Sequence, residues 1–259
     1  MTDATSPSRP TDDDLRQRLQ AVRLEVGKAV VGQDAAVTGL IIALLARGHV
    51  LLEGVPGVAK TLLVRSLSTA LQLDTKRVQF TPDLMPGDVT GSLVYDAKTG
   101  EFEFREGPVF TNILLADEIN RTPPKTQSAL LEAMEERQVS VDGLAKPVPT
   151  PFLVAAQAAA QATGVSTDVL GYVVDLARAT RRSPSVRLGV SPRGTTALLA
   201  AAKAWAWLTG YPSLTPDHVQ AMVLPVWRHR LQLRPEAELE GVGTDTILRQ
   251  VLQQVQVPI

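Results

Sequence analysis

One short segment restricts the possible folds of this chain more than any other: GVPGVAKT, residues 54–61. It matches the pattern G-x-x-x-x-G-K-[ST], except that Ala59 replaces the second glycine. The apolar run HVLLE (49–53) precedes it and is predicted as a strand, and a helical pattern follows from Thr61 to Leu71. Since strand, glycine-rich loop and helix form the context of a phosphate-binding loop, the segment predicts a site for a nucleoside triphosphate.

The last two residues of this segment have side chains suited to such a ligand. Backbone N–H groups of the loop would surround the β-phosphate, Lys60 would reach the β- and γ-phosphates, and the Thr61 hydroxyl would hold Mg²⁺. Ala59 lies where the helix begins, so it can take a helical conformation. The alternative is an ordinary turn between strand and helix, with a lysine that binds nothing.

Two carboxylates follow a second apolar run. Asp117 and Glu118 come directly after ILLA (113–116), a pattern typical of a strand buried in a parallel sheet. This places both at the carboxyl edge of the sheet, where ligands bind in such folds. We expect Asp117 to hold Mg²⁺ and Glu118 to act as general base toward water. A solvated Asp-Glu turn is the alternative. The phosphate loop some 60 residues earlier favours the metal site over this alternative.

The remaining pattern predicts an α/β core followed by helices. Helices are expected at about 11–27, 33–47 and 123–137, the first with Thr11 as its N-cap and Asp14 three residues on. Strands are expected at 77–81, 112–116 and 152–156, and hairpins around AKTG (97–100) and Asp142–Gly143. After Gly164 only helices are expected, two of them capped by Ser166 and Ser191. We therefore predict a disordered N-terminus (1–10), an α/β nucleotide-binding core (11–160) and an all-α lid (161–259).

Composition excludes several classes of function. The chain of 259 residues has a net charge of −1, which argues against nucleic acid as a partner, although a local basic channel stays possible. It has no cysteine, which excludes disulfides, thiolate zinc sites and cysteine nucleophiles. No apolar run approaches the roughly 20 residues that span a bilayer, and no secretory signal begins the sequence. We expect a cytoplasmic protein without a membrane segment.

Several long motifs together resemble the MoxR family of AAA+ ATPases. They are VVGQ (30–33), LLEGVPGVAKT, QFTPDLMPGDVTGS, GEFEFREGPVF, LLADEINRTPPKTQSALLEAMEERQVSVDG and GVSPRG. They occur in this order, and the resemblance covers residues from about 20 to the C-terminus. The resemblance implies a P-loop AAA+ core with a parallel sheet and an all-α C-terminal lid.

The resemblance also implies roles for individual residues. Arg193, at the start of a helix, resembles the sensor-2 arginine that reaches the γ-phosphate, although by itself it reads as a solvated charge. Lys60, Glu118 and Arg193 would be the catalytic residues, and Thr61 and Asp117 the metal ligands. Adenine would lie near Val31, Gly32 and Gln33. Asp117 and Glu118 would form the Walker B motif. The nucleotide would also be bound by the Walker A motif and the residue that follows it: Gly54, Val55, Pro56, Gly57, Val58, Ala59, Lys60, Thr61 and Leu62.

The family implies a function as well. ATP or ADP and Mg²⁺ would be the cofactors of a chaperone-like remodeller that hydrolyses ATP to mature or activate a partner protein or complex. Von Willebrand factor A domain proteins are the client class that the resemblance suggests, and a homo-oligomer, commonly a hexameric ring, is the expected assembly. The hairpin around Lys98 resembles an insert that contacts client protein in relatives, but it also fits a plain surface hairpin.

One departure from the family pattern bears on turnover. Relatives carry a polar sensor-1 residue and an arginine-finger helix after the strand that reads PFLVAA here. This chain continues VAAQAAAQATGVSTDVL (154–170), without Asn or Arg, and Gln157 is at most a remnant of the sensor turn. A true deletion and an omitted stretch both explain the gap. Since an arginine finger contributes about 10³–10⁵ in rate, the alternative function is a nucleotide-dependent assembly or binding module with little turnover.

Arg121 and the pair Trp205 and Trp207 give weaker indications. Arg121, just after DEIN, would form a local ion pair or, less readily, reach a neighbouring subunit's nucleotide. Trp205 and Trp207 are two residues apart on a predicted helix, so they face different sides. One of them should lie in the core.

Overall fold

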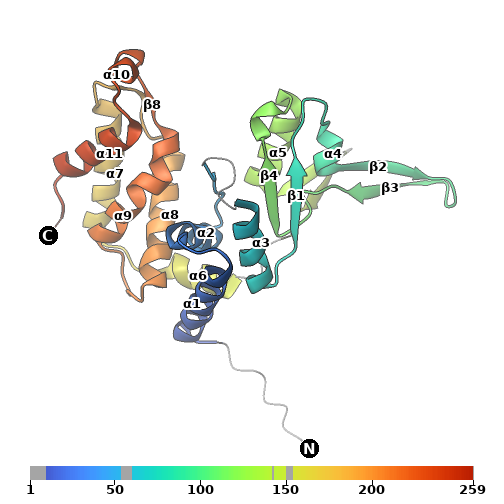
Figure 1. Ribbon diagram of the computed structural model, residues 1–259, viewed down its shortest axis with the longest axis horizontal. Helices are drawn as coiled ribbons and strands as arrows, with labels where there is room; N and C mark the ends of the chain where they lie inside the picture. The colour runs from blue at the N-terminus through green and yellow to red at the C-terminus, as the bar shows by residue number, and fades with distance from the viewer. Residues whose placement is uncertain (1–9, 54–59, 142, 150–153, 259) are drawn as a thin grey trace, which may run out of the picture. The chain divides into compact units, whose positions relative to one another are not determined.

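The computed structural model describes residues 10–53, 60–141, 143–149 and 154–258 (Figure 1). Contacts between residues divide the chain into two compact units, each considered by itself. Unit 1 consists of Met1–Arg23, Gln33–Glu53 and Leu153–Ile259, and unit 2 of Leu24–Gly32 and Gly54–Phe152. The boundary predicted between core and lid at residue 160 stays a prediction, and the predicted disorder of residues 1–10 falls almost wholly outside the described residues.

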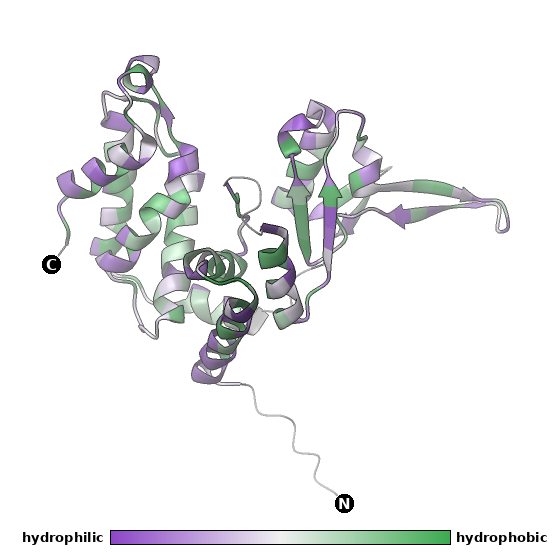
Figure 2. Ribbon diagram, in the orientation of Figure 1, coloured by the Kyte–Doolittle hydropathy of each residue, from purple (hydrophilic) through white to green (hydrophobic). Residues whose placement is uncertain are grey.

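Unit 2 is built around a parallel pair of strands. β1 (Thr75–Gln79) pairs with β4 (Ile113–Asp117), with Arg77 opposite Leu115 and Gln79 opposite Asp117. Figure 2 shows β4 as largely hydrophobic, while β1 has Val78 as its buried residue among polar neighbours. The predicted strand at 112–116 is therefore confirmed, and the strand expected at 77–81 begins two residues earlier.

Further helices and two hairpins belong to unit 2. The predicted helices after the phosphate loop and after Pro123 are confirmed as α3 (Lys60–Leu71) and α5 (Pro124–Glu136). Both predicted hairpins are present, although Asp142 of the second lies outside the described residues. The short helix α4 (Pro86–Thr90) precedes the first hairpin, and the hairpins are β2 (Gly91–Asp96) with β3 (Glu101–Glu106), and β5 (Gln138–Val141) with β6 (Leu144–Pro147). Their shared core consists of Val78, Phe80, Val89, Val109, Phe110, Leu130, Ala133 and Val139.

Two predicted strands are wrong in the part of the chain that the structure describes. Residues 48–53 have no regular structure, and Val50 and Leu51 are exposed. The segment 154–156 begins a helix, α6 (Val154–Ala162), and residues 152–153 are outside the description. An apolar run forms a strand only beside a partner that accepts its backbone hydrogen bonds. Without one, the alanines of 155–162 follow their helix propensity.

Gln157 has a structural position in unit 1. It lies in α6 with its side chain buried, donates through Nε2 to the Leu44 carbonyl at 2.7 Å, and accepts from Arg47 Nε at 3.0 Å. Leu44 lies near the end of α2 (Asp34–Leu45), where its carbonyl also accepts from the Arg47 N–H at 3.2 Å, so the Gln157 amide adds a second hydrogen bond at the helix end. The idea that Gln157 is a remnant of a sensor turn finds no support in this geometry.

The rest of unit 1 is mostly helical. Ser166 and Ser191 cap helices as predicted, each accepting a hydrogen bond from a backbone N–H three residues on. The expectation of helices only is wrong in one detail, because β7 (Val186–Leu188) pairs with β8 (Gln232–Leu233). The helices are α7 (Thr167–Arg182), α8 (Pro192–Leu208), α9 (Pro216–Trp227), α10 (Pro235–Leu239) and α11 (Thr244–Gln254), with short 3₁₀ turns at Ile119–Arg121 in unit 2 and Arg228–Arg230 in unit 1. No helix of the described residues is long and apolar enough to cross a membrane.

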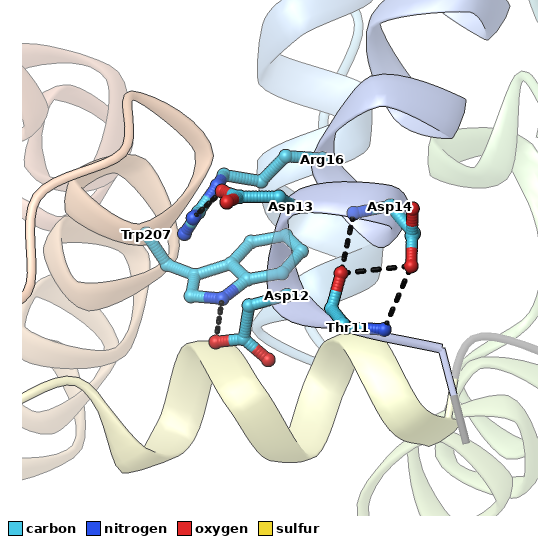
Figure 3. A network of polar contacts seen from close by, with 6 residues as sticks. All are labelled: Thr11, Asp12, Asp13, Asp14, Arg16 and Trp207. Carbon is cyan, nitrogen blue, oxygen red and sulfur yellow. Dashed lines mark hydrogen bonds and ion pairs between the residues drawn. The ribbon is translucent and has the colours of Figure 1, made fainter. Parts of the chain in front are cut away.

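The first turn of α1 (Asp12–Ala29) is tied to α8 through Trp207 (Figure 3). The indole Nε1 donates to Asp12 Oδ2 at 3.1 Å, and the Arg16 guanidinium lies 5.7 Å from the ring centroid. Arg16 also forms an ion pair with Asp13. Thr11 caps the helix as predicted, since the Asp14 backbone N–H donates to its hydroxyl and Asp14 Oδ2 accepts from its N–H. Of the two tryptophans on α8, Trp207 is thus buried and Trp205 is half-buried.

We expect Trp207→Phe to lower the melting temperature by about 2–8 °C. The change removes the bond to Asp12 and weakens the cation–π contact, together worth about 1–2 kcal/mol, and 1 kcal/mol corresponds to about 2–4 °C in a chain of this size. Thermal melts followed by far-UV circular dichroism measure the shift. Trp205→Phe is the matched control, and an equal shift in both variants would show that the contact with α1 contributes nothing.

His218 is buried in unit 1 and is held as a neutral imidazole. The backbone N–H of Thr215 points to its Nδ1 at 3.3 Å, so Nδ1 carries no proton and accepts. The Thr215 hydroxyl lies 2.6 Å from the same nitrogen. Burial lowers the pKa of His218, while the nearby carboxylate of Asp217 opposes that shift. The imidazole therefore closes the capping box of α9 only in its neutral form.

Acid is expected to destabilise unit 1 through this residue. A histidine whose pKa is lower in the folded state binds fewer protons there than in the unfolded chain. Its full contribution to stability is present above the unfolded pKa of about 6.5 and is lost as the pH falls through the folded-state pKa. Melting temperatures at pH 7.5 and 5.5 should differ less in His218→Asn, whose amide oxygen can accept from Thr215 but does not titrate. Burial is also the main cause that lowers the pKa of His229, so part of the difference in melting temperature between the two pH values should persist in His218→Asn. A difference as large as that of the parent chain would contradict the role given to His218.

Candidate functional site

The candidate site is formed where β4 ends. Asp117 is the last residue of the strand, and Glu118 follows it with φ 57° and ψ 38°, a left-handed conformation uncommon for residues other than glycine. Such a conformation persists only where neighbouring contacts hold it. The two carboxylates project at the carboxyl end of a parallel strand, as the sequence predicts.

Each carboxylate is paired with a side chain of β1. Arg77 Nε donates to Asp117 Oδ2 at 2.7 Å, and Gln79 Nε2 donates to Glu118 Oε2 at 2.7 Å. Arg121 Nη1 lies 3.2 Å from the same Glu118 oxygen. The local ion pair expected for Arg121 is therefore confirmed. Amide and guanidinium donors hold the Glu118 carboxylate in one orientation while 45% of its side-chain surface stays accessible, so a reacting molecule can still reach it.

The phosphate-binding elements lie in the same unit. Lys60 and Thr61 form the first turn of α3, both partly buried, and α3 packs against β4. A helix N-terminus offers free backbone N–H groups and a positive potential to an anion. Gly54, Val55, Pro56, Gly57, Val58 and Ala59 lie outside the described residues. What the structure brings together in one unit is the start of α3 and the carboxylate pair.

The other predicted site residues belong to several different elements. Val31 and Gly32 form the turn after α1, with Val31 86% exposed and Gly32 at φ 79°. Gln33 precedes α2. Arg193 is an exposed residue in the first turn of α8 in unit 1. Leu62 on α3 is 47% exposed. Their predicted roles toward adenine and phosphate stay predictions.

The chemistry of this cluster fits a magnesium nucleotide. Thr61, Asp117 and Glu118 supply oxygen atoms, which Mg²⁺ prefers, and the described residues contain no group of three or more acidic or histidine side chains that could enclose an ion alone. Mg²⁺ normally binds through one or two carboxylates together with phosphate oxygens and water. The residues present therefore fit a metal that arrives with a nucleotide.

Sequence reasoning missed Arg77 and Gln79. Both belong to a strand whose polar residues alternate with Val78, and the register of β1 against β4 brings them to the two carboxylates some 40 positions away. The sequence contains one indication of these two residues, because they are polar side chains at a spacing of two in the strand expected at 77–81. That spacing places them on one face of the sheet.

Comparison with known proteins places the chain in a class. Residues 49–167 match the family model "ATPase family associated with various cellular activities (AAA)", and residues 178–251 match "AAA lid domain". A crystal structure from Cytophaga hutchinsonii to which ATPase activity is attributed superposes with a TM-score of 0.89 at 30% identity, covering 96% of this chain and 97% of that one. The chain is an AAA+ ATPase with a P-loop α/β core and a helical lid, as the sequence predicts.

The relatives define the family more closely. The chain is 34% identical to "Chaperone MoxR1" of Mycobacterium tuberculosis, over 93% of this chain and 82% of that protein. It is 39% identical to the uncharacterised protein YeaC of Bacillus subtilis, over 95% and 97% of the two chains. The chain belongs to the MoxR family of AAA+ ATPases.

The same alignments contain positions that this chain does not fill. The alignment with the Bacillus subtilis protein has 311 positions, and 95% of a 259-residue chain fills about 246 of them, which leaves about 65 positions without a residue of this chain. For the Mycobacterium tuberculosis protein, 93% of the chain fills about 241 of 310 positions. These figures give the size of the shortage and not its place, so the absence of a sensor-1 and arginine-finger stretch between Val154 and Leu170 stays a prediction.

Proposed function

We propose that this protein binds Mg²⁺-ATP at the start of α3 and the end of β4, hydrolyses it, and uses the cycle to remodel a partner protein. The observation that carries the proposal is the shared unit: Lys60 and Thr61 begin a helix that packs on the strand ending in Asp117. Family membership supports the chaperone-like class. Maturation or activation of a client, with a von Willebrand factor A domain protein as the client class, is the finer part of the proposal.

Each residue of the proposed site has a separate task. The Lys60 ammonium and the N–H groups of the α3 N-terminus bind the phosphates, and the Thr61 hydroxyl and Asp117 carboxylate hold Mg²⁺. Bound Mg²⁺ neutralises charge on the phosphate oxygens. Glu118 accepts a proton from the attacking water, oriented by Gln79 and Arg121, which hold its Oε2 and leave the other oxygen for water.

Contributions from elsewhere belong to the proposal as well. Val31, Gly32 and Gln33 would contact adenine, and Arg193 would reach the γ-phosphate from the lid. A homo-oligomer, in the form of a hexameric ring, would place copies side by side so that nucleotide state passes between them. ATP, ADP and Mg²⁺ are the cofactors of this cycle.

The proposal is tested by a melting experiment combined with phosphate release. Saturating Mg²⁺-ATP should raise the melting temperature, because a ligand present at about 100 times its Kd stabilises the folded state by about 2.7 kcal/mol. Phosphate release should exceed that of Glu118→Gln. An unmoved melting temperature at saturating ATP would remove the basis of the proposal.

A second candidate function rests on the alignment gap. The arginine finger supplies charge to a neighbour's γ-phosphate, and its loss would leave nucleotide binding while reducing hydrolysis by about 10³–10⁵. The protein would then act as a nucleotide-dependent assembly or binding module with little turnover. Tight ATP binding without phosphate release above the Glu118→Gln level would favour this candidate. An intact mass near 27.8 kDa would show that the 259 residues are the whole chain.

A further inference from the structure

The β2–β3 hairpin projects from the rest of unit 2 (Figure 1). Its two antiparallel strands form a sheet of their own, so within the described ranges the outer edge of each strand pairs with no other strand. Such an edge presents backbone N–H and C=O groups that can pair with another extended chain. The hairpin therefore offers both a surface and a hydrogen-bonding edge.

One face of the hairpin is apolar beyond the Gly91–Glu106 pair at its base. Leu93 is opposite Phe104, and Tyr95 is opposite Phe102. Phe104 is anchored at the base, where its ring lies 5.6 Å from that of Phe110 in the core. Toward the tip, the Tyr95 and Phe102 rings lie 5.4 Å apart, with 56% and 68% of the two residues exposed. The core of unit 2 thus continues outward as an exposed aromatic pair.

The opposite face is acidic toward the tip. Asp96 is directly opposite Glu101, and Glu103 is opposite Val94, while Arg105 lies opposite Ser92 nearer the base of the same face. Like charges directly across a strand pair are destabilising, and among the described residues no ion pair reaches any of these three carboxylates. A cationic partner outside the chain would relieve this repulsion.

β3 combines both faces in one alternating sequence, Glu101-Phe102-Glu103-Phe104. A strand added beside it would place successive side chains alternately on the aromatic face and on the acidic face. We propose that the β3 edge binds, as an added strand, an extended client segment in which apolar and basic residues alternate. Backbone pairing would supply affinity, and the two faces would select the pattern. This inference rests on the proposed function for its client, and it names the chemistry by which that client is recognised.

The first experiment measures binding of labelled synthetic peptides by fluorescence anisotropy. A ten-residue peptide of alternating Leu and Lys should bind. Three control peptides should bind at least tenfold more weakly: alternating Leu and Glu, the same Leu and Lys composition in two blocks, and the alternating peptide N-methylated on every second residue. The Leu and Glu peptide tests the sign of the charge, and the two-block peptide tests the alternation of apolar and basic residues. The N-methylated peptide lacks the backbone N–H donors of one edge. Equal binding of any control peptide would overturn the proposal.

The second experiment changes the protein. Glu101→Lys with Glu103→Lys, and separately Phe102→Ser, should each weaken the alternating peptide at least tenfold. Glu236→Lys with Glu240→Lys, at exposed positions in and just after α10, is the matched charge control and should change binding less than twofold. Every variant should keep the ATP-dependent rise in melting temperature. A hairpin variant that loses that rise is set aside as misfolded, and the peptide controls then decide.

Failure of this inference can be told from failure of the proposed function. Peptide binding that follows the predicted pattern without any effect of ATP on melting supports the hairpin site and contradicts the ATPase. A rise in melting temperature with ATP, without peptide binding, supports the nucleotide site and contradicts the hairpin site. If sedimentation velocity shows a dimer that Phe102→Ser abolishes, and the peptides do not bind, the β3 edge pairs with a second copy and the client proposal is overturned.

Discussion

At an ATP concentration of about 100 times the parent chain's Kd, Lys60→Ala is expected to reduce the ATP-dependent rise in melting temperature to about half or less, while leaving the melting temperature without nucleotide almost unchanged. The ammonium group at the start of α3 is the one long cationic side chain of the phosphate-loop motif. Hydrogen bonds to charged groups contribute about 1.5–3 kcal/mol, which corresponds to about a 10- to 150-fold loss of affinity. Titration of ATP in differential scanning fluorimetry measures the shift and the apparent Kd.

Lys98→Ala is the matched control for this experiment. Lys98 lies in the turn of the β2–β3 hairpin, so removal of its charge should leave the response to ATP intact. A Lys60→Ala protein that still responds to ATP like the parent chain would contradict the phosphate-binding role. It would also favour the ordinary turn as the interpretation of GVPGVAKT.

Glu118→Gln is expected to reduce phosphate release by about 10²–10⁴, the usual contribution of a general base, while ATP binding is retained. Gln has nearly the shape of Glu, so the side chain can occupy the same place between Gln79 and Arg121. The amide cannot take a proton from water. Single-turnover release of labelled phosphate, with binding checked by the melting shift, separates the two effects.

Glu136→Gln at the end of α5 serves as the control, since it removes a carboxylate from the same unit at an exposed position. If Glu118→Gln and the parent chain release phosphate at equal rates, the interpretation depends on whether that rate is high or low. If both hydrolyse ATP well, Glu118 is not the base. If neither does, the chain is the nucleotide-dependent binding module that its missing segment suggests.

Much of the fold followed from local patterns. α1 with its Thr11–Asp14 cap, α3 after the phosphate loop, α5 after Pro123 and the hairpin around AKTG all lie where the sequence predicts them. In each case the residues that determine the element are close in the chain. A cap needs three residues, a hairpin needs a turn, and an amphipathic helix repeats its own period.

The two wrong strands show where local patterns fail. HVLLE and FLVAA have the composition of buried strands, yet residues 48–53 are irregular and Val154 begins a helix. A strand depends on a neighbouring strand to accept its hydrogen bonds, and among the described residues neither segment is paired with one. Without that neighbour, intrinsic preference decided the alanine-rich segment.

The candidate site divides in the same way. By itself, the sequence determined its chemistry: Lys60 and Thr61 after a glycine-rich loop, and Asp117 and Glu118 after an apolar strand. Only the tertiary structure placed Arg77 against Asp117 and Gln79 against Glu118, because these contacts depend on the register between β1 and β4. Register is set by pairing of segments far apart in the chain, and no local pattern specifies which residues it brings together.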